Sequence, residues 1–368
     1  MKKFLNEKNI IFYNPSFETG GVEKNIKSYI EHAYKLKNYN IILLTLDSTD
    51  IHKSLYTQYP VRKFRFRNRL IKYFICCYYL FKISLKKNNY IISFQNNIFA
   101  LFISIITRTK IAVRLNTSPE KYINSYVKKK IFSFFYRFAN LIIVNDEDFK
   151  KSVKKYFNIN SKIIHNFVNY DYVKDKSKEK INNQLFKKKT KIKIISVGRL
   201  TEQKNHINIL KAINNLKNKN IVELVIVGSG QQEHQLKKYI EKNFLNNVVK
   251  LIGYKKNPFK YIKHSNVFIL SSEYEGSPNI LLEVACLKKL IISSNCKTGP
   301  KRILLNGKGG YLYQTNNFIQ LSKIIDRLKF KDTSINKKIL TSYITAKKYS
   351  KNKQRIEFEM VIKKFISK

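Results

Sequence analysis

The sequence predicts an α/β protein with doubly wound parallel sheets, because short apolar runs alternate with segments of helical periodicity along its 368 residues. The clearest example is NVFILSS at 266–272, a bounded apolar run that predicts a buried strand. It is followed by NILLEVACLKKL, whose apolar spacing predicts a helix. Because 43% of the residues are hydrophobic, the chain can bury two cores of ordinary size. Ligands in such sheets bind beyond the carboxyl ends of the strands, so the loops after the predicted strands are the candidate site.

In chain order, the first predicted strand-loop-helix unit is IIFYNPSFETGGVEKNIKSYI at 10–30. Its loop contains Gly20 and Gly21, and a plain turn is the alternative interpretation of this glycine pair. Farther along, IAVRLNTSPEKY at 111–122 predicts a strand end that carries Arg114 and Asn116. The polar run KDKSKEKINNQLFKKKTK, which starts at residue 174, predicts a mobile lead-in to a second domain.

The second half of the chain repeats the strand, loop and helix pattern. The window 191–213 predicts one such unit, with Gly198, Arg199 and Lys204 in its loop. A glycine lets the backbone approach a ligand closely, and two cations can neutralise a diphosphate. Two further predicted strands lie within 220–236 and 248–254, and the second of them ends at Gly253 and Tyr254.

The loop at 273–283, EYEGSPNILLE, is the most informative stretch. It sets Glu275 and Glu283 eight positions apart around a tight turn, where they can hold opposite ends of one ligand. Unpaired N–H groups at the start of the following helix favour an anion or sugar hydroxyls. A loop acid and a helix-surface acid that both face solvent are the alternative. The backbone expected to contact the ligand comprises Gly276, Ser277, Pro278, Asn279 and Ile280.

Five strings carry a family resemblance: GRLTEQKN, LVIVGSGQ, LIGY, EYEGSPNILLEVA and TGPKRIL. In this order and at these spacings, over about 192–314, they resemble the donor-binding half of the retaining GT-B glycosyltransferases of family 4. The resemblance implies two Rossmann-like domains with an interdomain cleft. An acceptor-binding domain would occupy 1–166, a nucleotide-sugar-binding domain 167–346, and a helix at 347–368 would return to the first domain. The segment 163–173 resembles the crossover between the domains of that family.

The resemblance also implies roles for individual residues. Arg199, Lys204 and Glu275 would be the catalytic residues: the two cations stabilise the departing diphosphate, and Glu275 lies near the donor sugar. Glu283 would bind the ribose hydroxyls. The other donor contacts include Gly198 in the cationic loop. The resemblance places Gly20 and Gly21 so that they face the diphosphate from the first domain, and it places Gly253 and Tyr254 near the nucleobase. The remaining donor contacts are the 276–280 backbone and, at the phosphates, Thr298 and Gly299.

Two positions depart from the family pattern. The family often has a histidine near the reaction centre in the first domain, where this chain offers Arg114 and Asn116 as acceptor-side hydrogen-bond donors. An acid usually follows Gly-Pro-x in the family, and Arg302 takes that place.

From the resemblance as a whole, we expect a retaining hexosyltransferase that moves a hexose or N-acetylhexosamine from a nucleoside-diphosphate sugar, with UDP as the nucleotide. The expected acceptor is a lipid-linked, lipopolysaccharide or capsule glycan. A catalytically silent scaffold subunit of a glycan-synthesis complex is the alternative.

The charge balance is strongly positive, with 72 Lys and Arg against 24 Asp and Glu, a formal net charge of +48. This charge favours an anionic partner, which can be nucleic acid, an anionic membrane surface or an anionic lipid-linked substrate. Base composition of the source genome is the alternative explanation. Arg65, Arg67, Arg69 and Lys72 alternate with aromatic residues, a pattern that suits an interfacial membrane segment or a core helix. Nucleic-acid binding is disfavoured because the sequence contains no recognised module.

The remaining expectations concern metals and location. Neither the four cysteines nor the six histidines show metal-ligand spacing, so we expect no metal or other cofactor, the nucleotide sugar being a substrate. The longest apolar tracts are too short to span a bilayer, and the N-terminus shows no cleavable signal. We therefore expect a cytoplasmic protein that binds peripherally to the inner face of the membrane.

Overall fold

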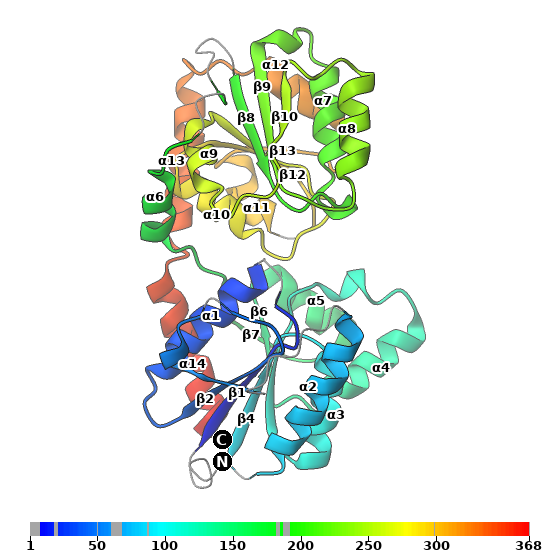
Figure 1. Ribbon diagram of the computed structural model, residues 1–368, viewed down its shortest axis with the longest axis vertical. Helices are drawn as coiled ribbons and strands as arrows, with labels where there is room; N and C mark the ends of the chain where they lie inside the picture. Colours follow the sequence, from blue (N-terminus) through cyan, green and yellow to red (C-terminus); the bar gives the residue numbers. More distant parts are fainter. Residues whose placement is uncertain are drawn as a thin grey trace. The chain divides into compact units, whose positions relative to one another are not determined.

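The computed structural model describes residues 8–17, 21–49, 51–59, 68–86, 88–181, 185–186, 192–297 and 299–367. The chain divides into two compact units (Figure 1). Unit 1 comprises 1–166 and 351–368, and unit 2 comprises 167–350. Each unit is built around one sheet whose described strands all pair in parallel.

The sheet of unit 1 has the strand order β3-β2-β1-β4-β5-β6-β7 among the described residues. The order reverses direction between β1 and β4, which is the topological switch point of this sheet. Apolar side chains bury the central strands of this sheet, as parallel sheets require, whereas the edge strands β3 and β7 are only partly buried. The strands are β1 (Asn9–Tyr13), β2 (Asn40–Leu44), β3 (Thr57–Tyr59), β4 (Asn89–Ser93), β5 (Lys110–Arg114), β6 (Leu141–Val144) and β7 (Lys162–Ile163).

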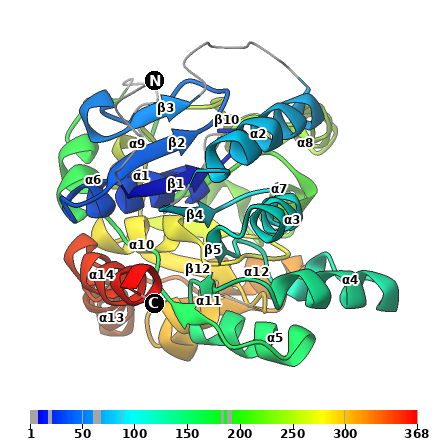
Figure 2. The same cartoon turned by 90° about the horizontal axis from the view of Figure 1, so that it is seen from below.

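Helices cover both faces of this sheet (Figure 2). On one face, α1 and α14 pack with residues such as Tyr29 and Phe358, and on the other face α2 to α5 pack with residues such as Leu101 and Phe149. The helices are α1 (Gly21–Tyr34), α2 (Arg69–Ser84), α3 (Asn97–Thr107), α4 (Tyr126–Tyr136), α5 (Glu147–Phe157) and α14 (Lys351–Ser367), with 3-10 turns η2 (Lys53–Leu55) and η3 (Pro119–Lys121).

The sheet of unit 2 has the order β10-β9-β8-β11-β12-β13 among the described residues. Its switch point lies between β8 and β11, which pair directly through Ile194 and Val267 and through Ile195 and Phe268. The strands are β8 (Ile192–Val197), β9 (Val222–Val227), β10 (Val249–Leu251), β11 (Val267–Leu270), β12 (Leu290–Ser294) and β13 (Tyr311–Tyr313).

Two cores lie on the two faces of this second sheet. One core includes Ile209 and Leu236, and the other includes Leu281 and Ala346. The helices are α6 (Tyr170–Ser177), α7 (His206–Asn214), α8 (Glu233–Lys242), α9 (Phe259–His264), α10 (Asn279–Cys286), α11 (Pro300–Ile303), α12 (Phe318–Asp326) and α13 (Thr333–Lys347), with 3-10 turns η4 (Glu202–Lys204), η5 (Lys219–Ile221) and η6 (Leu305–Gly307).

The predicted fold class is confirmed: both sheets are parallel, doubly wound and covered by helices on both faces. The lead-in predicted to be mobile from residue 174 is wrong at its start, because 174–177 form the last turn of α6. The side chain of Asn169 caps this helix by accepting a hydrogen bond from the Tyr172 N–H, and Val173 and Ser177 are buried beneath it.

Candidate functional site

The switch point of the second sheet brings together two loops that the sequence singled out. One loop follows β8 and contains Gly198, Arg199 and Lys204, and the other follows β11 and contains Glu275. Because β8 and β11 are neighbours, both loops leave the same carboxyl edge. In doubly wound parallel sheets, the carboxyl edge at the topological switch point is where ligands bind.

Lys204 and Glu275 form an ion pair at this edge. The Lys204 Nζ lies 2.6 Å from the Glu275 Oε1, and the two side chains are 17% and 8% exposed. The same carboxylate oxygen accepts a hydrogen bond from the Ser272 hydroxyl at 2.6 Å. A cation and an anion that the chain separates by 71 residues thus meet in a largely buried place.

Hydrogen bonds between the two loops fix this pair. The Ser271 hydroxyl donates to the Lys204 carbonyl at 2.7 Å, and the Glu273 N–H donates to the Gln203 carbonyl at 2.9 Å. The Gln203 side-chain amide donates to the Tyr274 carbonyl at 3.1 Å. The two loops therefore form one rigid platform, which holds the ammonium and the carboxylate in a constant geometry.

The glycines after β9 allow the loop that follows β8 to pack closely against their backbone. A Cβ atom on Gly228 would lie 1.8 Å from the Gly198 carbonyl oxygen, and one on Gly230 would lie 2.5 Å from the Leu200 carbonyl oxygen. The Leu200 N–H donates to the Ser229 carbonyl at 2.9 Å. Only glycine permits this backbone packing, so the Gly-Ser-Gly sequence supports the cationic loop.

A third glycine joins the loops after β11 and β12. Gly299 has φ +93°, and a Cβ there would lie 2.4 Å from the Pro278 Cδ. Pro278 is the N-cap residue of α10. The amide oxygen of Asn279 is buried and has no hydrogen-bond partner within the described ranges. It is an acceptor that a ligand hydroxyl could satisfy.

The other predicted donor-side residues of unit 2 lie on loops and helices of that unit, except for Thr298, which falls outside the described residues. Arg199 is exposed directly after β8, and Glu283 is buried on α10. Gly253 has φ +70° with open space beside it, and Tyr254 is exposed. Ser277, Gly276 and Ile280 are half-buried. In unit 1, Gly20 also lies outside the described residues, and Gly21 is the first residue of α1.

His206 belongs to the platform, although sequence reasoning missed it. It opens α7, it is 1% exposed, and a Cβ on Gly198 would meet its ring at 3.6 Å. Burial, and secondarily the charge of Lys204, lower the pKa of His206 to about 3, so the ring is neutral at neutral pH. Its Nδ1 has no hydrogen-bond partner in the described structure. The signal available in the sequence was its position two residues after Lys204.

In unit 1, the two acceptor-side candidates, Arg114 and Asn116, form hydrogen bonds with other residues of the same unit. The Arg114 guanidinium is 1% exposed and donates to the Tyr29 hydroxyl, to the Asn166 amide oxygen at 2.8 Å and to the Ile164 carbonyl at 3.3 Å. This burial gives Arg114 a structural role inside unit 1 and does not favour a ligand contact. The Asn116 amide donates to the Phe94 carbonyl at 2.8 Å and is half-buried.

The basic cluster predicted to contact a membrane is only partly described. Arg65 and Arg67 lie outside the described residues, and Arg69 is the first residue of α2 with an undescribed side chain. Lys72 is 13% exposed and pairs with Asp47 at 2.6 Å. The structure therefore assigns Lys72 to an internal ion pair, because its acidic partner lies 25 residues earlier in the chain and was invisible to local patterning.

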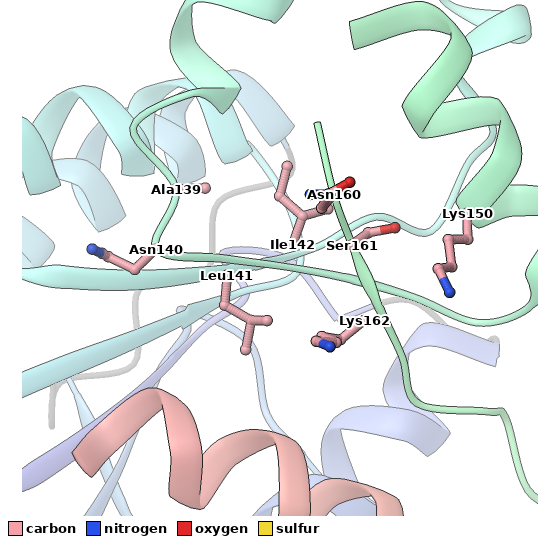
Figure 3. Close-up of a pocket in the computed structure, with 8 residues that line it drawn as sticks. All are labelled: Ala139, Asn140, Leu141, Ile142, Lys150, Asn160, Ser161 and Lys162. Atoms are coloured by element: carbon pink, nitrogen blue, oxygen red, sulfur yellow. The ribbon is translucent and has the colours of Figure 1, made fainter. Parts of the chain in front are cut away.

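A separate cavity of about 350 Å³ lies in unit 1 at the amino ends of β6 and β7 (Figure 3). It is lined by Ala139, Asn140, Leu141, Ile142, Lys150, Asn160, Ser161 and Lys162. This edge is opposite the carboxyl ends of the strands, and the cavity contains none of the predicted site residues.

Within the described ranges, no group of three or more His, Cys, Asp or Glu side chains is placed to hold a metal ion. No helix within those ranges is both long and apolar enough to cross a membrane.

Comparison with known proteins agrees with this geometry. Residues 177–349 match the model of the family described as Glycosyl transferases group 1, and this range lies within unit 2. The chain is 35% identical over 211 residues to an uncharacterized glycosyltransferase of Methanocaldococcus jannaschii, which covers 54% of this chain and 52% of the relative. It is 28% identical over 218 residues to an N-acetylgalactosamine-N,N'-diacetylbacillosaminyl-diphospho-undecaprenol 4-alpha-N-acetylgalactosaminyltransferase of Campylobacter jejuni, covering 57% of this chain and 58% of the relative. The matches thus span little more than half the length of these two curated relatives.

The fold likeness extends across both units. The Anabaena protein HepE, crystallised in complex with UDP and glucose, superposes with a TM-score of 0.78 at 16% sequence identity. The match covers 97% of this chain and 100% of HepE. At this identity the likeness establishes the fold, and the chain has the two Rossmann-like parallel-sheet domains of the GT-B fold.

Proposed function

We propose that the protein is a retaining glycosyltransferase that moves a hexose or N-acetylhexosamine from UDP to a lipid-linked, lipopolysaccharide or capsule glycan. The observation that carries this proposal is the Lys204–Glu275 pair at the β8/β11 switch point of a glycosyl transferases group 1 domain. Cleavage of the bond between sugar and diphosphate develops negative charge on the leaving phosphate. A fixed cation at that place lowers the barrier.

The geometry explains how one lysine can serve this chemistry while it is paired. An ammonium group has three N–H donors. One donor of Lys204 is directed to Glu275, which leaves two for phosphate oxygens. The carboxylate thus orients the cation before substrate arrives. Arg199 is exposed on the same loop and would add the second charge against the diphosphate.

The acidic and amide groups would recognise the rest of the donor. Glu275 lies beside the cation that would hold the phosphate, so we assign it to the donor sugar. Glu283, buried on α10, is assigned to the ribose hydroxyls. The unpartnered amide oxygen of Asn279 would accept a further sugar hydroxyl.

Relatives supply the substrate classes of the proposal. The name of the Campylobacter jejuni relative describes transfer to a diphospho-undecaprenol-linked sugar, and HepE was crystallised with UDP and glucose. We transfer both classes to this chain: UDP as the donor nucleotide and a lipid-linked glycan as the acceptor. A cytoplasmic location on the inner face of the membrane and turnover without a metal cofactor belong to the same proposal.

A catalytically silent scaffold subunit is the second candidate, and Arg302 is the observation that favours it. This arginine stands where the family usually has an acid. Its Nη1 donates to the Tyr349 hydroxyl at 2.6 Å, and its guanidinium lies 5.6 Å from that ring. This side chain packs within unit 2, so the acidic residue that the family usually places at the donor edge is absent here.

Purified protein separates the two candidates. A thermal-shift screen of nucleotide sugars identifies the donor, because a ligand that binds only the folded state raises its apparent stability. Release of UDP is then measured with and without a lipid-diphosphate-linked sugar. Lys204→Met is the test variant, and Lys211→Met, at an exposed position on α7, is the matched control. Donor binding without turnover in the wild type supports the scaffold and refutes the enzyme.

A further inference from the structure

Three adjacent helices of unit 1 present an apolar outer surface. In unit 1, α2 packs beside α3, and α3 packs beside α4, on one face of the sheet (Figure 2). Side chains on the side of these helices that faces away from the sheet are exposed although they are large and apolar. We name as the α2–α4 face the surface formed by Phe74, Phe99, Phe102, Ile106, Val127 and Phe134, of which Phe74 is 67% and Val127 is 65% exposed.

The middle helix makes this surface unusual. The sequence of α3, NIFALFISIIT, contains no charged residue. Leu101 and Ile103 are buried in the core of the unit, while Phe102 and Ile106 are 51% and 54% exposed. A helix at the surface of a soluble protein normally carries polar residues on its outer side. Large exposed apolar side chains on three neighbouring helices, with the Phe74 and Phe99 ring centres 6.5 Å apart, therefore mark a binding surface.

The charges around the α2–α4 face identify the kind of partner. Between Arg69 and Phe138 the sequence has 13 Lys and Arg and one acid, Glu120. The carboxylate of Glu120 accepts hydrogen bonds from the Ser118 and Ser152 hydroxyls at 3.0 and 2.9 Å. Among these cations, Lys72 pairs with Asp47 and Arg114 is buried. The exposed ones on or directly after the three helices include Lys82, Lys86, Arg108, Lys128, Lys130 and Arg137, so the same helices present cations beside the apolar surface.

Two of these cations lie against exposed aromatic rings. The Lys82 Nζ lies 4.7 Å from the centre of the Tyr78 ring, and the Lys130 Nζ lies 4.8 Å from that of Tyr126. Amphipathic pairs of this kind suit a boundary between an apolar phase and anionic head groups. The ring and the lysine stem enter the apolar side, and the ammonium stays at the polar side.

We propose that the α2–α4 face inserts into the head-group region of an anionic lipid bilayer. The occupant is a lipid surface rather than a second copy, because two copies placed face to face would oppose two strongly basic rims. The contact differs from that expected of the 65–72 cluster, because exposed apolar side chains of three helices make it. The proposal rests on the proposed function for the lipid-linked acceptor, but vesicle binding is measured without donor or turnover, so the two can fail separately.

The chain itself offers a clean probe, because it contains no tryptophan. Phe102→Trp places a single reporter on the α2–α4 face, and Phe244→Trp places one at a 90% exposed position in unit 2. With vesicles of phosphatidylglycerol and phosphatidylcholine, we expect the emission of the first reporter to shift to the blue and to be quenched by brominated lipid. The second reporter should show neither change.

A loss-of-binding variant completes the test. Phe102→Ser combined with Phe134→Ser should weaken partitioning into acidic vesicles by about tenfold or more, since about half of each ring loses its apolar contact. Both residues are more than half exposed, so folding is preserved, and circular dichroism checks this. Part of the wild-type binding should persist at about 0.5 M salt, where a purely electrostatic contact is lost.

Three results would overturn the proposal. Unchanged vesicle binding by the double serine variant would show that another surface makes the contact. Equal binding to neutral and acidic vesicles would remove the role of the cationic rim. A blue-shifted emission of the Phe102→Trp variant without lipid, together with a dimer in sedimentation, would mean that a second copy covers the face.

Discussion

The Lys204–Glu275 pair allows a quantitative test of the site through a double-mutant cycle. Its side chains are 17% and 8% exposed, and the N–O separation is 2.6 Å. Removing one partner of a buried pair leaves an uncompensated charge and typically costs about 3–5 kcal/mol. Because Ser272 still donates to the carboxylate, Lys204→Met should cost about 3 kcal/mol, at the lower end of that range.

The double variant should lose less stability than the sum of the two single variants. Glu275→Gln keeps the shape of the side chain but removes its charge, and combined with Lys204→Met it leaves no unpaired ion. We expect a coupling of about 2 kcal/mol, within the range measured for residues in direct contact. For a unit of this size, 1 kcal/mol corresponds to about 2–4 °C in Tm, so Lys204→Met should lower Tm by roughly 6–12 °C.

An exposed ion pair in the same unit provides the control for this cycle. Lys237 and Glu233 on α8 are 2.8 Å apart, but their side chains are 57% and 37% exposed. Such surface pairs couple by less than about 1 kcal/mol. The cycle Lys237→Met with Glu233→Gln is measured by the same thermal unfolding. A Lys204–Glu275 coupling no larger than this control would refute the buried geometry of the site.

Three further predictions concern turnover, metal and pH. Lys204→Ala should reduce kcat about a hundredfold, whereas Glu283→Ala should mainly raise the donor KM, because ribose contacts change little in the transition state; wild-type kinetics in both variants would contradict the assignment. Turnover should be unaffected by a chelator, and activity abolished by it and restored by magnesium or manganese would show that the site needs a metal. His206 has its pKa lowered from 6.5 to about 3. The unfolded chain therefore binds a proton that the folded chain does not, and the stability of the wild type should fall by about 2 kcal/mol between about pH 6.5 and 4.5. The free energy of unfolding in urea should depend more steeply on pH in the wild type than in His206→Asn. Identical pH dependence in the two proteins would contradict the burial of the His206 ring.

Much of the site was predictable because the relevant signals are local. A glycine or a cation directly after an apolar run marks the carboxyl end of a strand, and neighbouring strand ends share one edge of the sheet. This reasoning placed Lys204 and Glu275 in loops at the same edge. It could not show that they pair, since the contact joins residues 71 positions apart and depends on β8 and β11 being neighbours.

The features that sequence reasoning missed depend on tertiary contacts. Gly228 and Gly230 support a neighbouring loop, and this role becomes visible only where the Gly198 and Leu200 carbonyls pack against them. Lys72 belongs to a basic and aromatic run that suggested a membrane contact, but its ammonium group forms an ion pair with Asp47. His206 was one of six scattered histidines until burial beside Lys204 distinguished it.

The α2–α4 face also depends on tertiary contacts that the sequence pattern does not show. For this reason, sequence composition points to the basic run at 65–72 instead. An uncharged eleven-residue segment such as α3 is typical of a buried helix, so its residues offer no reason to expect rings on its outer side. Hydrophobic periodicity identifies an apolar side only where a polar side contrasts with it. In α3 both sides are apolar, and only the structure separates Leu101, which is buried, from Phe102, which is exposed. A surface that spans three helices can be recognised only after the sheet has brought those helices together, which is why the basic run at 65–72 stood out first.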